Sequence, residues 1–372
     1  MPDNCQILVL NAGSSSLKFA LYAPDGGIVS RDQIEGIGRG GNVADHAAAL
    51  DRVFSKLADA GDIAAVGHRV VHGGGVFAAP EVVTPALLAT LETFEPLAPH
   101  HQPHNLTAIR TVDAARPGIL QVACFDTAFH ADMPAEARET GLPRAYGNAG
   151  IRRYGFHGLS YEYIVGALPR ISGEPLPERL IVAHLGNGAS MAAVKGGRGV
   201  ATTMGFSTAD GIPMATRSGA VDPGALIEVM RRDGLDAAGI EDVLYNRAGL
   251  LGLSGVSADM RTLLASEDPA AAAAVSFFCY RIAREIGSLA AATGGLDALV
   301  FTGGVGANAA PVRADVCRRS AWLGVEMSPD RNHSGGPVIS TDASGVAVYA
   351  MATDEESVIA DHTRALADGS PG

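Results

Sequence analysis

The segment from residue 6 to residue 19 constrains the fold of this chain more than any other. An apolar strand, residues 6–10, runs directly into a turn of small and polar residues and out into a second strand (QILVLNAGSSSLKF). Small side chains let backbone N–H groups approach an anion, and Ser, Asn and Lys side chains donate hydrogen bonds to its oxygens. Residues 181–194 repeat the order of strand, polar turn and strand. This pattern favours a duplicated fold with a phosphate-binding turn in each half, although repeats this divergent also arise by chance.

Strand-like apolar runs alternate with helix-like runs rich in Ala and Leu along the rest of the chain. This order is typical of an α/β fold with mixed sheets. The strand-like runs are residues 6–10, 19–22, 65–70, 121–125, 179–183, 191–194, 298–302 and 346–349. The helix-like runs are residues 43–60, 85–95, 105–115, 161–168, 223–232, 270–292 and 311–320.

Composition narrows the class of protein. The 372 residues are enough for two domains, and 47% of them are hydrophobic, which allows an extensive core. The formal net charge of −12, without a long basic run, argues against nucleic acid or an anionic membrane as a partner. No apolar stretch approaches the length of a membrane span, no signal-peptide pattern is present, and the four cysteines are scattered. These features predict a cytoplasmic protein with reduced thiols.

Eight blocks, in order along nearly the whole chain, resemble the acetate kinases and related short-chain acyl kinases. They are residues 11–18 (NAGSSSLK), 67–74 (GHRVVHGG), 125–130 (FDTAFH), 153–158 (RYGFHG), 184–190 (HLGNGAS), 216–219 (TRSG), 301–306 (FTGGVG) and 353–356 (TDEE). The resemblance implies the two-domain actin/hexokinase/Hsp70-like ATPase fold, with a duplicated mixed-sheet core and an active-site cleft between the domains. It also implies reversible transfer of the terminal phosphoryl of ATP to acetate, giving acetyl phosphate and ADP, with Mg²⁺ as the metal and a homodimer as the assembly.

The resemblance also implies how the chain is divided. We expect an N-terminal acyl-kinase domain of residues 1–125 plus 355–372, completed by a returning C-terminal helix, and a nucleotide-binding and dimerisation domain of residues 126–354. Since no linker rich in Pro and Ser separates them, we expect a hinge rather than a tether.

Four residues are the expected catalytic groups. Phosphoryl transfer needs positioning and charge stabilisation, and the planar guanidinium of arginine suits phosphoryl and carboxylate oxygens. The resemblance implies that Arg69 and Arg217 bind the acid and the transferring phosphoryl group, although a lone Arg is more often a surface ion-pair partner. It implies that His157 donates to that phosphoryl group; a purely structural histidine and a phospho-histidine carrier are the alternatives. Asp126 ends an apolar strand, where a carboxylate suits Mg²⁺ organisation or orientation of the arginines.

The expected metal and nucleotide residues come from the same blocks. Asn11 and Glu355 are expected near Mg²⁺, Glu355 through water; alternatively Glu355 is simply an acidic residue at a helix N-terminus. The residues expected to contact the nucleotide are Lys18, Ser14, Ser16, His184, Leu185, Gly186, Asn187, Gly188, Gly304, Val305, Gly306 and Asn308. Residues 304–309 also fit a relaxed dinucleotide fingerprint, so a dehydrogenase is an alternative, and His184 could instead anchor its loop.

The acid pocket departs from the family pattern. The resemblance places Arg69, Val71, Phe156, His100 and Thr208 around the acid, but an aliphatic residue usually stands at the position of His100 and a proline at that of Thr208. A more polar pocket puts the preferred acid in doubt, so a propionate or other short-chain carboxylate kinase is the first alternative and a non-catalytic nucleotide-binding module the second.

Two further observations qualify the resemblance. The usual glutamate in the adenosine block is Ala307, which bears on nucleotide preference. A zinc site of the metal-hydrolase type is a weak alternative, because the histidines in the first half of the chain lack the His-Glu-x-x-His spacing. These histidines are residues 68, 72, 100, 101, 104 and 130.

Overall fold

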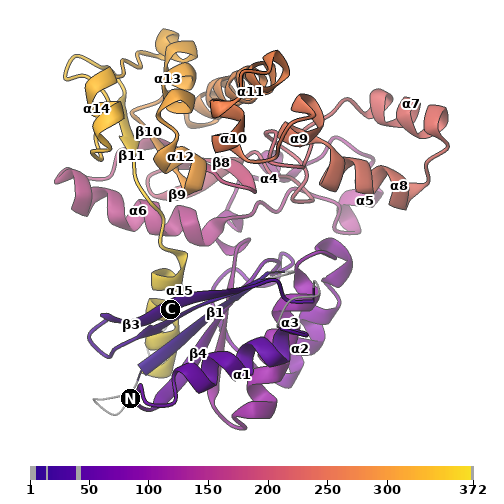
Figure 1. The fold of residues 1–372 in the computed structure, drawn as a ribbon, viewed down its shortest axis with the longest axis vertical. Helices are drawn as coiled ribbons and strands as arrows, with labels where there is room; N and C mark the ends of the chain where they lie inside the picture. Colours follow the sequence, from indigo (N-terminus) through magenta and orange to yellow (C-terminus); the bar gives the residue numbers. More distant parts are fainter. Residues whose placement is uncertain (1–5, 14–15, 39–42, 370–372) are drawn as a thin grey trace. The chain divides into compact units, whose positions relative to one another are not determined.

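The chain forms two compact units in the computed structural model, which describes residues 6–13, 16–38 and 43–369 (Figure 1). Unit 1 is drawn from residues 1–131, 156–163 and 354–372, and unit 2 from residues 132–155 and 164–353. The change of unit falls after Ala131, a few residues beyond the boundary expected at residue 126. Unit 1 also takes in the short segment 156–163, which contains His157.

The sheet of unit 1 begins with the predicted pair of strands. β1 (Gln6–Ala12) and β2 (Ser16–Tyr22) are antiparallel, with Ala12 opposite Leu17, and the Gly13 N–H donates to the Ser16 carbonyl at 2.8 Å. The sheet order is β3-β2-β1-β4-β6-β5. β4 runs parallel to both β1 and β6, whereas β3 and β5 pair antiparallel to their neighbours. The remaining strands are β3 (Ile28–Glu35), β4 (Ile63–Val70), β5 (Glu81–Val82) and β6 (Leu120–Phe125).

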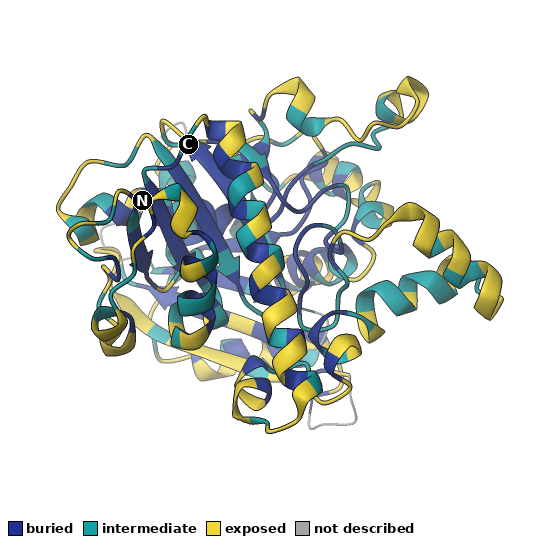
Figure 2. Ribbon diagram, turned by 90° about the horizontal axis from the view of Figure 1, so that it is seen from above, coloured by how far each residue is buried: buried dark blue, intermediate teal, exposed yellow. Residues whose placement is uncertain are grey.

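Helices cover both faces of this sheet, and the alternation of side chains along β1 shows how. Leu8 and Leu10 join a buried cluster with α1 (His46–Lys56) and α3 (Gln102–Ala115). Ile7 and Val9 point to the other face and pack with α15 (Glu355–Ala367). Successive strand side chains point to opposite faces, so a strand buried on both faces is apolar throughout. Figure 2 shows such buried strands beneath helices whose outer faces are exposed. Unit 1 also contains α2 (Pro85–Glu92), η1 (Glu95–Leu97) and η2 (Ala128–His130).

The sheet of unit 2 repeats this topology. Its order is β11-β10-β7-β8-β9, in which β7 pairs antiparallel with β8 and parallel with β10. β7 and β8 therefore correspond to β1 and β2, and β10 and β11 to β4 and β6. The two matching sheets confirm the predicted α/β fold with a duplicated mixed-sheet core. The strands are β7 (Arg179–Leu185), β8 (Ala189–Lys195), β9 (Arg198–Thr202), β10 (Ala298–Thr302) and β11 (Ala347–Ala350).

The helices of unit 2 are short apart from α11 (Pro269–Thr293). Asp268 caps the start of α11 by accepting from the Ala270 N–H, and Gly294 ends it with a φ of 78°, a conformation that glycine adopts without strain. Of the helices in the part of the chain that the structure describes, none is long and apolar enough to cross a membrane. The others are α4 (Ala135–Arg138), α5 (Arg144–Asn148), α7 (Pro223–Asp233), α8 (Ala237–Asp242), a π-helix η3 (Val243–Arg247), α9 (Gly249–Ser254), α10 (Met260–Ala265), α12 (Gly303–Asn308), α13 (Ala310–Arg319), η4 (Ala321–Leu323) and α14 (Pro329–Ser334). α6 (Gly158–Ser172) begins in unit 1 and continues into unit 2.

Some elements differ from the sequence prediction for local reasons. β3 was not predicted, because it is a mostly exposed edge strand whose polar residues give no apolar run. The helix expected over residues 43–60 is shorter, since Asp45 caps it by accepting from the Ala48 N–H and the helix ends after Lys56. α6 extends past the predicted end at residue 168 and contains Pro169 near its C-terminus.

Close packing of α15 on the sheet makes Gly67 a sensitive position. A Cβ placed on Gly67 of β4 would collide with Thr363 Oγ1 and would lie 2.6 Å from Ile359 Cγ2. We therefore expect Gly67→Ala to lower the free energy of unfolding by about 1–3 kcal/mol, the usual cost of overpacking. Gly166→Ala is the control, because a Cβ on this residue of α6 meets nothing within 4 Å. The control should be unchanged or up to about 1 kcal/mol more stable. Urea unfolding measures both, and a Gly67→Ala variant as stable as wild type would contradict the packing argument.

Candidate active site

An arginine–carboxylate pair lies where two parallel strands of unit 1 end. Arg69 precedes the last residue of β4, and Asp126 directly follows β6; the register pairs Val70 with Phe125. The carboxyl ends of neighbouring parallel strands meet at one edge of a sheet, so the two side chains lie close together. Arg69 Nε donates to Asp126 Oδ1 at 3.0 Å and Arg69 Nη2 donates to Oδ2 at 2.6 Å. Asp126 is only 1% exposed, so this two-pronged pair is held in a fixed orientation.

A second carboxylate and an amide face the same guanidinium. Glu355, the first residue of α15, lies 3.8 Å from Arg69 Nε through its Oε2 atom, and Asn11 Oδ1 accepts from Arg69 Nη1 at 3.3 Å. Burial raises the pKa of Glu355 to about 7, with the Arg69 charge opposing and the Asp126 charge adding to this shift. Burial alone would lower the pKa of Arg69, but the charges of Asp126 and Glu355 raise it above its ordinary value. Arg69 thus faces two carboxylates, and the charges of Glu356 and Lys18 also act on Glu355, the first raising and the second lowering its pKa.

This set of oxygen ligands fits the expected Mg²⁺. Mg²⁺ prefers oxygen, keeps several waters and takes one or two carboxylates together with phosphate oxygens. Asn11 and Glu355 supply such oxygens beside the buried pair. Within the described ranges, no group of three or more His, Cys, Asp or Glu side chains could hold a metal by itself.

His157 has an unusual backbone. Its φ is +58°, and no other non-glycine residue in the described ranges has a positive φ. This conformation costs about 1–3 kcal/mol for such residues and is concentrated at functional sites. The adjacent Gly158 N–H donates to the Asp126 carbonyl at 2.8 Å, which ties the start of α6 to the end of β6. The strained His157 backbone therefore lies next to the residue that orients Arg69.

The residues expected around the acid differ in burial. Val71 and Phe156 are buried in unit 1, and His130 Nε2 donates to the Phe156 carbonyl at 3.0 Å. His100 is exposed on the loop before α3, so its role at the acid rests on the resemblance alone. Thr208 is buried in unit 2, where its carbonyl oxygen is the acceptor for Arg217 Nη1 at 3.1 Å.

Arg217 lies in a turn that the π-helix η3 supports. Its guanidinium lies 5.8 Å from the centre of the Tyr245 ring, and the neighbouring Thr216 Oγ1 donates to the Tyr245 carbonyl at 2.7 Å. Burial lowers the pKa of Arg217, although an arginine stays protonated. A partly desolvated guanidinium interacts more strongly with an anion than one in water.

Two turns expected at the nucleotide meet in unit 2. β7 and β10 are parallel neighbours, with His184 beside Thr302, so their following turns share one edge of the sheet. A Cβ on Gly303, whose φ is 75°, would lie 2.7 Å from the Leu185 carbonyl oxygen, so only glycine fits there. The structure thereby brings the predicted residues 184–188 beside residues 304–308. The glycine block itself forms the short helix α12, in which Asn308 Nδ2 donates to the Gly304 carbonyl at 2.9 Å.

Two of the three residues expected in the first turn lie on β2. Ser14 lies outside the described residues. Ser16 begins β2, and Lys18 pairs with Asn11 across the β1–β2 hairpin with its side chain exposed. Leu17 and Phe19 are buried, so the alternation along β2 places Lys18 on the other face.

Comparison with known proteins decides the family. The family model described as the Acetokinase family matches residues 6–361. The chain belongs to this acetokinase family.

Its relatives are similar over their whole length. A curated acetate kinase from Rhodopseudomonas palustris (strain TIE-1) is 48% identical over 98% of both chains. One from Rhizobium meliloti is 43% identical over 97% of this chain and 98% of its own. The crystal structure of Porphyromonas gingivalis acetate kinase matches with a TM-score of 0.90 at 38% identity, over 97% of this chain and 99% of its own. A propionate kinase from Francisella tularensis subsp. tularensis SCHU S4 matches with a TM-score of 0.92 at 34% identity and the same coverage.

The acetokinase chain also contains supporting residues that sequence reasoning missed. Arg313 is 2% exposed, and its guanidinium donates to the carbonyls of Gly306 at 3.0 Å and Ala307 at 2.8 Å. It thereby holds the end of α12 in the nucleotide block. The sequence gives one sign that Arg313 is buried: it occupies an otherwise apolar position of a helix. An arginine at such a position is buried only if its guanidinium has partners. Gln102 and Asn105 are buried amides at the start of α3 and are treated below.

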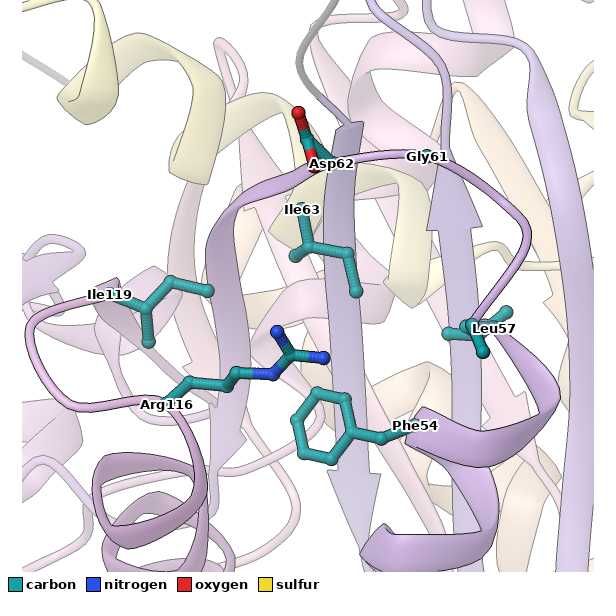
Figure 3. A pocket seen from close by; sticks show the side chains of 8 residues that line it. Phe54, Leu57, Gly61, Asp62, Ile63, Arg116 and Ile119 are labelled. Carbon is teal, nitrogen blue, oxygen red and sulfur yellow. The ribbon is translucent and has the colours of Figure 1, made fainter.

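A pocket of this acetokinase lies away from these residues. It has a volume of about 180 Å³ and is lined by Phe54, Leu57, Ala58, Gly61, Asp62, Ile63, Arg116 and Ile119. Figure 3 shows the Arg116 guanidinium over the Phe54 ring, at 5.3 Å from the ring centre. Ile63 begins β4 and Ile119 precedes β6, so this pocket is at the opposite strand ends from Arg69 and Asp126. It is therefore distinct from the candidate active site around Arg69 and Asp126.

The raised pKa of Glu355 gives a pH prediction for this acetokinase. Between about pH 4.5 and pH 7 the folded protein holds a proton at Glu355 that the unfolded chain releases. Linkage then makes the free energy of unfolding fall as the pH rises through this range, and Glu355→Gln should remove that part of the pH dependence. Since a bound cation favours the ionised carboxylate, Mg²⁺ should raise the melting temperature of wild type more at pH 8 than at pH 6. Thermal unfolding of both proteins is the measurement, and identical pH profiles would contradict the assignment.

Proposed function

We propose that the chain is an acetate kinase, which transfers the terminal phosphoryl of ATP to acetate to give acetyl phosphate and ADP, and which also catalyses the reverse reaction. The observation that carries this proposal is the Arg69–Asp126 pair with Glu355 and Asn11 at the ends of β4, β6 and β1, in a chain similar over its whole length to acetate kinases. A charged cluster of this kind suits a phosphate-transferring site and has no need of a covalent intermediate.

The reaction needs charge stabilisation more than proton transfer. A carboxylate oxygen of acetate attacks the terminal phosphorus of ATP, and the bond from that phosphorus to the bridging oxygen of ADP breaks. Acetate is ionised at neutral pH, so no general base is required. This accords with Asp126, whose two oxygens both accept from Arg69. Arg69 Nη1, on the Asn11 side, is the nitrogen that would meet an anion.

The other catalytic residues share the charge of the transferring group. Arg217 would bind the phosphoryl oxygens or the carboxylate, and its partial desolvation strengthens that interaction. His157 would donate a hydrogen bond to the same phosphoryl group in a direct, in-line transfer. Mg²⁺, held by Asn11 and by Glu355 through water, would neutralise the phosphate charge when bound.

The nucleotide would contact the residues of the three turn blocks. In unit 2 these are His184, Leu185, Gly186, Asn187, Gly188, Gly304, Val305, Gly306 and Asn308, and in unit 1 they are Ser14, Ser16 and Lys18. The β10–α12 junction supports this assignment, since Gly303 allows its turn to approach Leu185 closely. Ala307 stands where family members usually have Glu. The proposal therefore includes a nucleotide preference that differs from theirs, with nucleotide binding retained.

A propionate kinase is the second candidate, favoured by the similarity to the Francisella tularensis structure. Val71 and Phe156 would form the apolar wall against the methyl end of the acid. His100 and Thr208 would make part of that wall polar. A buried methyl group contributes about 0.8 kcal/mol, so such a wall weakens discrimination between acids of similar length.

A homodimer and a cytoplasmic location complete the proposal. α11 exposes Tyr280, with the guanidinium of Arg284 at 5.9 Å from its ring. Nearby, Trp322 is 71% exposed, and its Cζ2 atom would lie 3.3 Å from a Cβ on Gly287 of α11. Exposed Trp, Tyr and Arg side chains are typical of protein interfaces, which supports this face of unit 2 as the dimer contact. ATP as the phosphoryl donor supports a location in the cytoplasm.

An acid panel tests the activity directly. The purified protein, incubated with ATP, Mg²⁺ and hydroxylamine, should form hydroxamate with acetate or propionate, because hydroxylamine traps an acyl phosphate. No reaction should depend on NAD. The ratio of kcat/KM values between acids identifies the preferred one. A folded protein that yields no hydroxamate with any acid of two to four carbons would refute the proposed function.

The two arginines should be essential for turnover. We expect Arg69→Lys and Arg217→Ala each to lower kcat by about 10³-fold or more, since each removes or misplaces a fork that stabilises the transferring phosphoryl group. His157→Ala should lose about 10²–10³-fold. Arg110→Ala is the control, because Arg110 forms an exposed ion pair with Glu92 in unit 1 and should leave kcat unchanged. Circular dichroism confirms folding, and near-normal turnover in either arginine variant would remove that residue from catalysis.

A further inference from the structure

Two consecutive carbonyl groups at the end of β1 are bound by buried side chains. Asn105 Nδ2 donates to the Ala12 carbonyl at 2.8 Å, and His46 Nε2 donates to the Gly13 carbonyl at 2.7 Å. Asn105 is 2% exposed and His46 is 7% exposed. These peptides directly follow Asn11, so their orientation determines where the Asn11 side chain points.

Asn105 connects this turn to a second strand. Its Oδ1 atom accepts from the Val71 N–H at 3.0 Å, while its Nδ2 atom donates to the Ala12 carbonyl. A side-chain amide can donate and accept at once, which no carboxylate or apolar side chain of the same size does at neutral pH. The amide thus links the end of β1 to the end of β4, where Arg69 lies two residues before Val71.

His46 is braced by the same helix as Asn105. It is the first residue of α1, and its ring stacks on His104 of α3 with centroids 5.1 Å apart and planes at 26°. His104 is adjacent to Asn105 in the sequence. α1 and α3 lie side by side against the sheet (Figure 1), so both side chains reach the turn from one packed layer. The packed helices α1 and α3 therefore fix the Ala12 and Gly13 carbonyls from the buried side of the turn.

Gln102 offers a comparison within the same helix. It is fully buried, accepts from the His72 N–H at 3.2 Å and donates to the His72 carbonyl at 3.1 Å. It satisfies buried backbone groups as Asn105 does, but its hydrogen bonds join it to His72 and to the Leu91 carbonyl, and none of those printed for the described residues reaches Ala12 or Gly13. A purely structural amide and a positioning amide therefore lie one turn of helix apart, and their variants can be compared.

We infer that Asn105 and His46 are positioning residues of the phosphoryl-transfer site, which hold the Ala12 and Gly13 peptides so that Asn11 and Arg69 keep their relative placement at the end of the sheet. This inference rests on the proposed function. Neither residue touches the reacting groups. Side chains that orient the residues around a metal typically change metal affinity or activity by about 10–100-fold when they are replaced.

Asn105→Asp tests the hydrogen bond from Asn105 to the Ala12 carbonyl separately from the one to Val71. It preserves size and the acceptor for the Val71 N–H, but replaces the donor to the Ala12 carbonyl with a second oxygen. His46→Phe keeps an aromatic ring against His104 and removes the donor to Gly13. We expect each variant to lower kcat and to raise the Mg²⁺ concentration needed for half-maximal rate by about 10–100-fold, while KM for the acid changes less.

Gln102→Glu is the matched control, since it removes a buried amide donor from the same helix without affecting the turn. It should lower the melting temperature at least as much as Asn105→Asp and leave the Mg²⁺ requirement as in wild type. Equal kinetic effects of Asn105→Asp and Gln102→Glu, or normal kinetics in both Asn105→Asp and His46→Phe, would overturn the positioning role.

Hydrogen exchange separates this inference from the proposed function. The amides of Ala12 and Gly13 should exchange faster in Asn105→Asp than in wild type or Gln102→Glu, whether or not the protein forms hydroxamate. An inactive wild type with this exchange pattern would refute the proposed function and still support the positioning role of Asn105. Unchanged exchange of the Ala12 and Gly13 amides in Asn105→Asp would refute the positioning role even in an active enzyme.

Discussion

The buried ion pair between Arg69 and Asp126 is the interaction around which unit 1 is arranged. Removing two charges from water costs several kcal/mol of solvation free energy. Their attraction offsets this cost only when the geometry is good and further hydrogen bonds are made. Here both conditions hold, because both Asp126 oxygens accept from Arg69 and Asn11 accepts from the remaining nitrogen. Such a pair adds little net stability, but the loss of either partner leaves an unpaired buried charge. Its value therefore lies in fixing the direction of one guanidinium.

That geometry depends on the order of strands. β1, β4 and β6 are parallel neighbours, so Asn11, Arg69 and Asp126 leave the sheet at one edge. Unit 2 uses the same order with β7, β10 and β11, and there the turns after β7 and β10 come together. A single topology thus builds two sets of loops of different chemistry, one of charged groups and one of glycines and amides. The chemistry of each set is determined by the residues at strand ends rather than by the sheet.

The sequence was sufficient to predict the parts of the site that follow from periodicity. Apolar runs identified β1, β4 and β6, and the position of Asp126 after an apolar run marked it as a group that could orient the arginines or organise Mg²⁺. The eight family blocks located the glycine turns near residues 184–188 and 304–308. What it did not reveal depends on contacts between distant segments. Nothing in the local sequence around Asn105 indicates that its amide joins Ala12 to Val71, since that contact requires α3 to lie across the ends of two strands.

The edge strand β3 and the burial of Arg313 were missed for the same kind of reason. β3 exposes most of its residues, so it carries no apolar pattern, and it exists because β2 offers a free edge for pairing. The burial of Arg313 likewise depends on the end of α12 and on Asn332, which accepts from Arg313 Nε at 2.7 Å. In both cases tertiary partners, and not local propensity, determine the structure.

The closing of unit 1 by α15 has a consequence for biosynthesis. α15 is the last helix of the described chain to leave the ribosome, yet it covers the face of the first sheet formed by Ile7 and Val9. Until it arrives, that face lacks the apolar side chains of α15 and has Leu159 of α6 beside it, whereas nearly all of unit 2 has already been made. The order of synthesis therefore favours completion of unit 2 before unit 1. Glu355 begins this same helix, so the second carboxylate joins Arg69 and Asp126 only after the residues of unit 2 have been translated.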